Sequence, residues 1–183
     1  MSFGWAGEKT RLVPLDKAKH LDNALLWFND PESTTHLLIG DFPLTKLAEE
    51  AYFDRVMKEC KEDVPFAIET LEGRHIGFTA LHNLQWQHRT ATCGIAIGEP
   101  NLRGQGYGPD ALRTLTRYSF DVLGLRLVMS EVMAENSASQ RMMEKAGYRE
   151  IARIPQRYWR RGDYRDALIF AQYAEEWRRG QAK

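Results

Sequence analysis

The fold is decided by residues 95–110, which read IAIGEPNLRGQGYGPD. An apolar run leads into a polar loop with glycines at alternate positions, and a Pro-Asp pair then precedes apolar residues at helical spacing. This pattern predicts a strand, a loop and a helix in that order. The backbone N–H groups of a glycine loop and of a helix N-terminus together favour an anion, so a pyrophosphate would fit at this junction.

Three glycines carry that interpretation. Gly104, Gly106 and Gly108 leave φ free, so that consecutive N–H groups can turn toward one ligand. We expect Pro109 at the first position of the helix, because its missing N–H would be unpaired there in any case. Arg103 adds a permanent positive charge at the entrance of the loop. The alternative is an ordinary strand-to-helix turn that binds nothing.

Two other phosphate-binding loops do not fit the sequence. The Rossmann fingerprint is Gly-x-Gly-x-x-Gly, with an acidic residue about 20 positions later. Here Gly106 is followed by Gly108 and then Pro109, and no acidic partner is obvious in a second strand. A Walker loop requires Gly-Lys-Ser or Gly-Lys-Thr, which the chain lacks.

Length and composition narrow the class of protein. The 183 residues suit one domain with a sizeable core, so we expect residues 1–183 to form a single domain. Lysine plus arginine equals aspartate plus glutamate, at 25 each, so no overall charge attracts nucleic acid or an anionic membrane. The sequence has no apolar run of the roughly 18 residues that a membrane span needs, and no apolar signal-peptide core. We therefore expect a soluble cytoplasmic protein, monomeric or homodimeric.

The cysteines give no sign of a structural cross-link. Cys60 and Cys93 have neither the number nor the spacing of a disulfide framework or a zinc site. We therefore expect a reducing compartment and no metal.

The hydrophobic pattern predicts strands and helices along the whole chain. We expect strands at about residues 11–15, 64–70, 75–84, 90–97, 127–133, 151–158 and 164–173, and helices at about residues 21–28, 45–60, 109–123 and 137–146. Thr45 is a predicted helix N-cap, and Ser137 with Gln140 forms a capping-box pattern. Gly124 and Gly147 are predicted left-handed caps, and the polar C-terminal tail is expected to fray.

One motif matches a known family. Residues 103–108 fit Arg/Gln-x-x-Gly-x-Gly/Ala, a signature of the GNAT superfamily of N-acetyltransferases. Four segments in the same order resemble the RimJ/RimL branch, whose members acetylate protein N-termini and small amines: residues 103–111, 135–139, 144–148 and 161–167. The resemblance implies a mixed α/β (α+β) fold, in which one GNAT-like domain has a twisted, mostly antiparallel central sheet of about seven strands and about four flanking helices.

The resemblance also implies where coenzyme A binds. Backbone groups near Ile97 and Gly98 would pair with the pantetheine arm, in a wedge between the strand at 90–97 and the strand that ends near Asn136. The side chain of Asn136 would reach the cofactor arm or an ordered water, and its alternative role is that of a turn residue. The expected cofactor-binding residues are Ile97, Gly98, Arg103, Gly104, Gln105, Gly106, Tyr107, Gly108, Asn136 and Ser139.

The general acid departs from the family pattern. Many GNAT enzymes carry a tyrosine seven residues after the asparagine, but here that residue is Met143. Ser139 has the spacing at which RimL-like enzymes place a hydroxyl proposed to protonate the thiolate; its alternative role is to bond the backbone at a helix start. Either Ser139 or a nearby tyrosine such as Tyr158 acts instead, or the thiolate leaves without a dedicated acid.

The general base departs from the family as well. RimL-like enzymes carry a glutamate in the sixth strand, where this chain has Tyr158. The replacement candidates are Glu131, His82 and His88. Burial would raise the pKa of Glu131 toward a useful range, whereas on an outward face it would be a solvated acid. The histidines titrate in the right range, but they could equally form a polar hairpin tip. Base catalysis through water would need none of them.

Two further sets of residues bear on the acceptor. In the family the first pair of helices walls the acceptor site, and isolated aromatic residues could line it or belong to the core or rim: Trp27, Trp86, Tyr158 and Trp159. Basic residues of the last hairpin would favour an acidic acceptor or a protein partner, or would simply be solvated: Arg157, Arg160, Arg161 and Arg165.

The sequence therefore predicts an acetyl-CoA-dependent N-acetyltransferase, an acyltransferase without a metal. A neutral primary amine would attack the thioester directly, since neither cysteine lies in the motif region after Ile95. The acceptor stays open between a protein N-terminus, a polyamine, an aminoglycoside and another small amine. The rival predictions are a catalytically silent acyl-CoA-binding or sensing module of the same fold, favoured by Met143, and a nucleic-acid-binding protein, which the balanced charge disfavours.

Overall fold

A computed structural model describes residues 4–37, 42–58 and 62–181. In these residues eight strands form one sheet in the order β1-β2-β3-β4-β5-β6-β8-β7, antiparallel except where β5 meets β6. The strands are β1 (Trp5–Ala6), β2 (Thr10–Pro14), β3 (Val64–Thr70), β4 (His75–Gln85), β5 (Thr90–Ile97), β6 (Leu127–Met133), β7 (Arg149–Arg160) and β8 (Asp163–Tyr173). The α-helices are α1 (Lys17–Phe28), α2 (Lys46–Lys58), α3 (Tyr107–Arg117), α4 (Ser137–Lys145) and α5 (Ala174–Gln181), with a 3-10 turn at Pro100–Leu102 and a π-helical turn at Tyr118–Val122. The expected mixed, mostly antiparallel α/β fold is confirmed.

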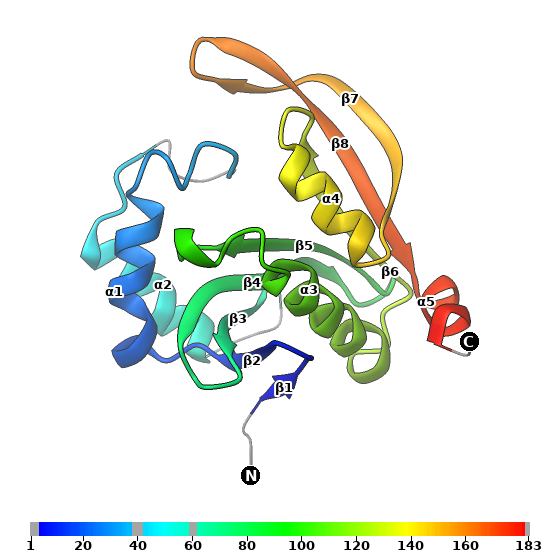
Figure 1. Cartoon of the computed structure of the whole chain (residues 1–183), viewed down its shortest axis with the longest axis horizontal. Coiled ribbons are helices and arrows are strands. Elements are labelled where there is room, and N and C mark those ends of the chain that lie inside the picture. The colour runs from blue at the N-terminus through cyan, green and yellow to red at the C-terminus, as the bar shows by residue number, and fades with distance from the viewer. Residues whose placement is uncertain (1–3, 38–41, 59–61, 182–183) are drawn as a thin grey trace.

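Helices cover both faces of the sheet. On one face α3 and α4 contribute Leu112 and Met143 to a large core, and Figure 1 shows these two helices side by side in front of the strands. On the other face α1 and α2 contribute Leu21 and Phe53 to a smaller core with Ala67 of β3. The two sides are called the α3–α4 face and the α1–α2 face below.

The strand register assigns the side chains of β6 to these faces, because successive residues of a strand point to opposite sides. Val132 belongs to the core under α3 and α4, so its neighbour Glu131 points to the α1–α2 face. Tyr158 on β7 lies opposite Arg165 of β8 and shares the face of Glu131. The β7–β8 hairpin extends beyond the rest of the sheet as an arm (Figure 1).

The strands β5 and β6 separate partway along the sheet. Their parallel pairing covers three residue pairs, from Thr90 with Leu127 to Thr92 with Met129. Both strands continue beyond this point, β5 paired with β4 and β6 paired with β8. Backbone groups on the facing edges are thereby left without a strand partner in the middle of the sheet. The opening lies where the family resemblance implies a wedge.

Local chain signals account for several boundaries. Gly124 has φ 66° and Gly147 has φ 93°, so both predicted left-handed caps are confirmed. The hydroxyl of Thr45 accepts a hydrogen bond of 3.2 Å from the N–H of Ala48, which confirms its capping role at α2. The tail after β8 was expected to fray, but it forms α5, in which Trp177 is buried against the large core.

Two helix starts and one helix cap differ from the prediction. The helix α1 begins at Lys17, before the expected start at about residue 21. The helix α3 begins at Tyr107 with Gly106 as N-cap, so Pro109 is its third residue and the expectation of a first position is wrong. The whole first turn of a helix lacks N–H acceptors, so proline is tolerated there. Asn136, and not Ser137, caps α4, which corrects the predicted capping box.

The structure also bears on the expectations for the cysteines and for a membrane span. Burial raises the pKa of the Cys93 thiol to about 11, so this thiol stays neutral and unreactive. Cys60 lies outside the described residues. In the described part of the chain, none of the helices combines the length and apolar character that crossing a membrane requires.

Candidate functional site

The glycine loop between β5 and α3 presents free backbone donors. Gly104 has φ 76° and Gly106 has φ 89°, a region that favours glycine. Among the described residues, no well-formed hydrogen bond takes up the backbone N–H groups of residues 104–108. These groups lie at the N-terminus of α3, where the helix dipole also favours negative charge. The arrangement can therefore hold a phosphate or diphosphate.

At Gly108 close packing, and not a positive φ, requires glycine. Its φ is not positive, so the expectation that all three glycines free the backbone is wrong at this position. A Cβ atom at Gly108 would lie 2.8 Å from the Sδ atom of Met142 on α4. The missing side chain lets α3 and α4 approach each other beside the loop.

The side chain of Arg103 turns back toward the end of β5. Its guanidinium donates to the carbonyl oxygens of Ile97, at 2.9 Å, and Gly98, at 3.1 Å. It also donates to the Ser33 hydroxyl, at 2.9 Å, in the turn that follows α1. Arg103 therefore joins that turn to the end of β5, and its expected contact with a cofactor stays a prediction.

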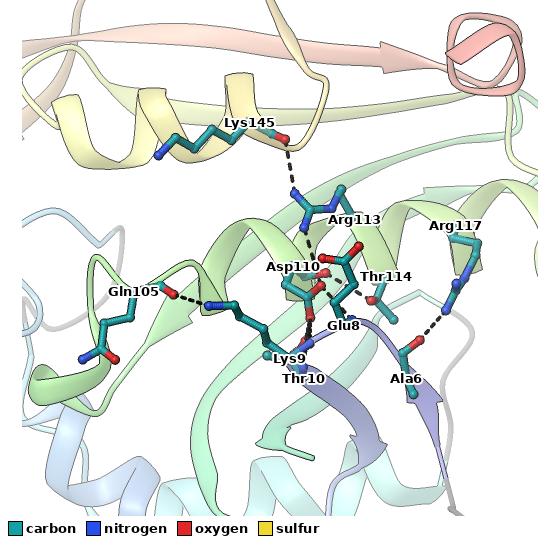
Figure 2. A network of polar contacts seen from close by, with 10 residues as sticks. All are labelled: Ala6, Glu8, Lys9, Thr10, Gln105, Asp110, Arg113, Thr114, Arg117 and Lys145. Carbon is teal, nitrogen blue, oxygen red and sulfur yellow. Dashed lines mark hydrogen bonds and ion pairs between the residues drawn. The ribbon is translucent and has the colours of Figure 1, made fainter. Parts of the chain in front are cut away.

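A buried carboxylate fixes the N-terminal segment beside this loop (Figure 2). Asp110, in the first turns of α3, is 3% exposed and accepts hydrogen bonds from the N–H groups of Glu8, Lys9 and Thr10, at 3.0, 3.0 and 2.9 Å, and from the Thr10 hydroxyl, at 2.6 Å. Burial favours a raised pKa, but these hydrogen bonds outweigh it, so the pKa of Asp110 lies below its ordinary value. A Cβ atom at Gly7 would lie 2.4 Å from Asp110, so glycine is needed for this close approach.

Sequence reasoning missed this network, since residues 8–10 and Asp110 are about a hundred positions apart. The ammonium group of Lys9 also reaches the loop, 3.0 Å from the carbonyl oxygen of Gln105. Asp110 itself gave a weak signal, because an acidic residue in the first turns of a helix suits the dipole.

Trp27 was a candidate lining residue, but it belongs to the packing beneath the site. It is buried against His75 and Phe78, with ring centroids 4.9 and 5.9 Å away. A Cβ atom at Gly98 would lie 2.0 Å from its indole ring, so α1 packs directly on the end of β5. Trp86 and Trp159 are exposed, and Trp86 lies in the turn at the far end of β5.

Replacing Gly98 with alanine should lower the free energy of unfolding by about 2 kcal/mol, because the new methyl group would overlap the Trp27 ring. Urea unfolding measures this loss. Gly180→Ala is the control, since a Cβ atom there meets nothing within 4 Å, and it should change stability by less than about 0.5 kcal/mol. Gly98→Ala combined with Trp27→Leu should cost less than the sum of the two single changes, and simple additivity would contradict the overlap.

Asn136 and Ser139 lie together at the start of α4. The side-chain oxygen of Asn136 accepts a hydrogen bond of 3.0 Å from the N–H of Ser139, so Asn136 caps α4, a local role close to the turn residue that was the alternative for it. Both side chains are half-buried, and within the described part of the chain the Ser139 hydroxyl has no hydrogen-bond partner. Their predicted cofactor contacts remain predictions.

Glu131 and Tyr158, predicted separately as catalytic residues, are in direct contact. The Tyr158 hydroxyl donates a short hydrogen bond to Glu131, and the Nε atom of Arg157 lies 3.4 Å from the same carboxylate oxygen. Burial, together with the hydrogen bond to Glu131 and its charge, raises the pKa of Tyr158 to about 12. The phenol therefore keeps its proton near neutral pH and orients the Glu131 carboxylate, which is 29% exposed. Ser139 is on α4, across the sheet from this pair.

The two histidine candidates have different surroundings. His82 lies on the same face of the sheet as Glu131, with Nδ1 3.1 Å from a carboxylate oxygen of Asp63 and Nε2 3.6 Å from where a Cβ atom of Gly94 would be. It is therefore still a candidate base. His88 is exposed in the β4–β5 turn, at the opposite end of β5 from the glycine loop, so it is not brought to the site.

The basic hairpin is engaged with other parts of the chain. Arg160 donates to the carbonyl oxygens of Thr34 and Leu37, at 3.0 and 2.6 Å, and Arg161 donates to that of Pro31, at 2.9 Å. Arg157 contacts Glu131, and Arg165 contacts Glu135 and Asp163. These contacts attach the arm to the turn after α1, around a cavity of about 350 Å³ lined by Thr35, His36, Glu135, Arg160, Arg161 and Arg165. The interpretation as a free basic surface is not supported.

Comparison with known proteins identifies the family. A family model described as "Acetyltransferase (GNAT) domain" matches residues 9–149. Two curated relatives are the uncharacterized N-acetyltransferase YoaA of Bacillus subtilis, 26% identical over 112 residues, and the prophage-derived uncharacterized N-acetyltransferase YokL of the same organism, 24% identical over 164 residues. These alignments cover 61% of this chain and 63% of YoaA, and 85% of this chain and 92% of YokL.

Solved structures share the fold. The spermidine N-acetyltransferase of Vibrio cholerae, in complex with CoA and spermine, superposes with a TM-score of 0.84 at 20% identity, over 92% of this chain and 97% of that one. A structure described as a putative acetyltransferase gives a TM-score of 0.77 at 25% identity, over 100% of this chain and 92% of that one. Because the family model covers most of the sequence, the chain belongs to the acetyltransferase (GNAT) family of acyltransferases.

Proposed function

We propose that this protein transfers the acetyl group of acetyl-CoA to a primary amine. The observation that carries the proposal is the opening between β5 and β6, which leads to the free N–H groups of residues 104–108 at the start of α3. An extended arm could take up the unpaired edge of β5 while its diphosphate lies on the loop. Residues 1–183 would form one such domain.

In the proposed reaction each reactant reaches the opening from its own face. Acetyl-CoA would lie on the α3–α4 face, next to Asn136 and Ser139 of α4, and the amine would enter from the face that carries Glu131 and Tyr158. The amine nitrogen attacks the thioester carbonyl carbon, the C–N bond forms and the C–S bond breaks. Glu131 takes the proton that the amine loses, directly or through a water, and Ser139 donates a proton to the departing thiolate.

The chemistry of the acceptor face favours a cationic substrate over an acidic one. Glu131 and Glu135 supply carboxylates there, each 3.4 Å from one arginine with which an ammonium group would compete, whereas Arg160 and Arg161 donate to backbone carbonyl oxygens of the turn after α1. A protonated amine approaching this face would be attracted to the carboxylates and would lose its proton before attack. We therefore propose polyamines, such as the spermine bound in the Vibrio cholerae structure, as the first choice of acceptor. Protein N-termini, which RimJ/RimL-like enzymes acetylate, are the second choice.

A second candidate function has one observation in its favour. Met143 is at the position where many enzymes of the family carry a tyrosine as general acid. Its side chain is 1% exposed within the large core. No proton donor can act from this position. A catalytically silent module that binds acyl-CoA would retain the loop and the opening without needing Glu131 or Ser139.

Titration calorimetry with acetyl-CoA, followed by thiol release over spermidine, spermine, N-terminal peptides and aminoglycosides, tests the proposal. We expect binding and turnover with at least one amine. Gly106→Ala should weaken acetyl-CoA binding by about tenfold, because alanine at this φ disturbs the loop by about 1 kcal/mol or more.

Gly73→Ala is the matched control, since Gly73 has the same φ of 89° in a turn away from the site. Gly73→Ala should lower the stability of the protein about as much as Gly106→Ala does, but it should leave acetyl-CoA binding unchanged. Binding without turnover on any amine would favour the silent module, and no binding at all would overturn both functions.

A further inference from the structure

One cation lies directly against the backbone of the glycine loop. The Nζ atom of Lys9 is 3.0 Å from the carbonyl oxygen of Gln105 and 3.6 Å from where a Cβ atom of Gly106 would be. It also lies 5.7 Å from the centre of the Tyr107 ring. Arg103, the cation expected here from the sequence, is turned away toward Ile97 and Gly98. Lys9 is thus the basic side chain that contacts the loop backbone.

The contact with Gln105 fixes the direction of a neighbouring donor. In a trans peptide the C=O of one residue and the N–H of the next point to opposite sides, and the described residues contain no cis peptide bond. When Lys9 holds the Gln105 carbonyl on its own side, the Gly106 N–H is directed to the other side. Glycine at φ 89° would otherwise allow this peptide unit to rotate at little cost.

The backbone of Lys9 is itself held in place. Its N–H donates to Asp110, at 3.0 Å, within the buried network drawn in Figure 2. Asp110 belongs to α3, the helix that the loop precedes, so the base of the lysine side chain and the loop are attached to one element. The side chain of Lys9 is exposed and crosses from the β1–β2 turn to Gln105. Its ammonium is therefore preorganised on the carbonyl side of the peptide between Gln105 and Gly106.

We propose that Lys9 is a positioning residue for the diphosphate of acetyl-CoA: it orients the peptide between Gln105 and Gly106 so that the Gly106 N–H faces the ligand, and it adds a positive charge behind that donor. The inference rests on the proposed function and names a residue outside the family motif. It assigns Lys9 to the diphosphate and not to the 3′-phosphate of the cofactor.

The test compares Lys9→Met, which keeps the aliphatic length, with Lys9→Arg, which keeps the charge and the donors. Lys9→Met should raise KM and Kd for acetyl-CoA by about tenfold, the loss of roughly one charge-assisted hydrogen bond, with kcat within about twofold. Lys9→Arg should restore most of the affinity. Lys58→Met, at an exposed lysine at the end of α2, should leave KM for acetyl-CoA unchanged.

The same measurements with 3′-dephospho-acetyl-CoA locate the effect. An equal loss of affinity with both cofactors supports the diphosphate, and a loss that disappears with the dephospho form overturns that assignment in favour of a 3′-phosphate contact. An unchanged KM in Lys9→Met, with normal binding by the unaltered protein, would overturn the inference alone. Failure of the unaltered protein to bind acetyl-CoA would overturn the proposed function and this inference with it.

Discussion

Glu131→Gln is expected to lower kcat by about 100-fold, the usual effect of losing a general base. Glutamine keeps the shape of the side chain and can still accept the hydrogen bond of Tyr158, but it cannot take a proton from the amine. Because Glu131 points away from the α3–α4 face, where the cofactor is proposed to lie, KM for acetyl-CoA should stay within about twofold of its original value. Steady-state thiol release with a saturating amine measures both constants.

Two further variants separate the candidate bases. Tyr158→Phe removes the orienting hydroxyl but no proton acceptor, so we expect a loss of only about fivefold in kcat. His82→Gln should leave kcat nearly unchanged if Glu131 is the base. A full rate in Glu131→Gln together with a slow His82→Gln would reject Glu131 and assign the role to the pair of Asp63 and His82.

Asp110→Asn is expected to lower the free energy of unfolding by about 3 kcal/mol, the range for a buried carboxylate that holds several donors. The carboxylate accepts from three backbone N–H groups and from the hydroxyl of Thr10. The side-chain NH2 group of asparagine would instead point its own N–H donors at the N–H and O–H donors of residues 8–10. For a chain of this size the loss corresponds to a melting temperature lower by roughly 10 °C, which thermal unfolding measures.

The same pair of proteins gives a test of pH dependence. The pKa of Asp110 is lowered in the folded protein, so its contribution to stability is present above the unfolded value, ordinarily 3.8, and is lost as the pH falls through the folded value. The difference in stability between the unaltered protein and Asp110→Asn should therefore be full at pH 7 and narrow below about pH 4. Asp121→Asn, at an exposed position, is the control, and equal losses at pH 7 in both variants would contradict the network.

Short-range signals were sufficient for much of the fold. The strand at Leu127–Met133 was predicted with its observed bounds, because a nearly continuous apolar run, interrupted by Ser130 and Glu131, between Gly124 and a polar turn has few other interpretations. The glycine loop was predicted for a similar local reason. The start of α3 was placed two residues late, since the preference of proline for a first helical position outweighed the ability of Gly106 to cap the helix.

Long-range contacts were beyond the reach of the sequence. Lys9 and Gln105 are 96 positions apart, and Arg103 and Ser33 are 70 apart, and neither pair has a periodic or motif signal. Glu131 and Tyr158 were each predicted as catalytic candidates, but their direct contact depends on how β6 and β7 are placed on either side of β8. The short strand β1 and the polar helix α5 were missed because two residues show no alternation and a polar helix shows little contrast.

The separation of β5 and β6 also has a consequence for the folded chain as a whole. Within the described residues, the sheet has two parts, β1 to β5 and β6, β8 and β7. Only three residue pairs, all between β5 and β6, connect these parts by strand pairing. We expect the amides along the open edges to exchange their hydrogens with water, and we expect α3 and α4, which contact each other, to help hold the two parts in register. A molecule that forms hydrogen bonds with those edges would complete the pairing, so by mass action it would raise the melting temperature with the logarithm of its concentration relative to its Kd.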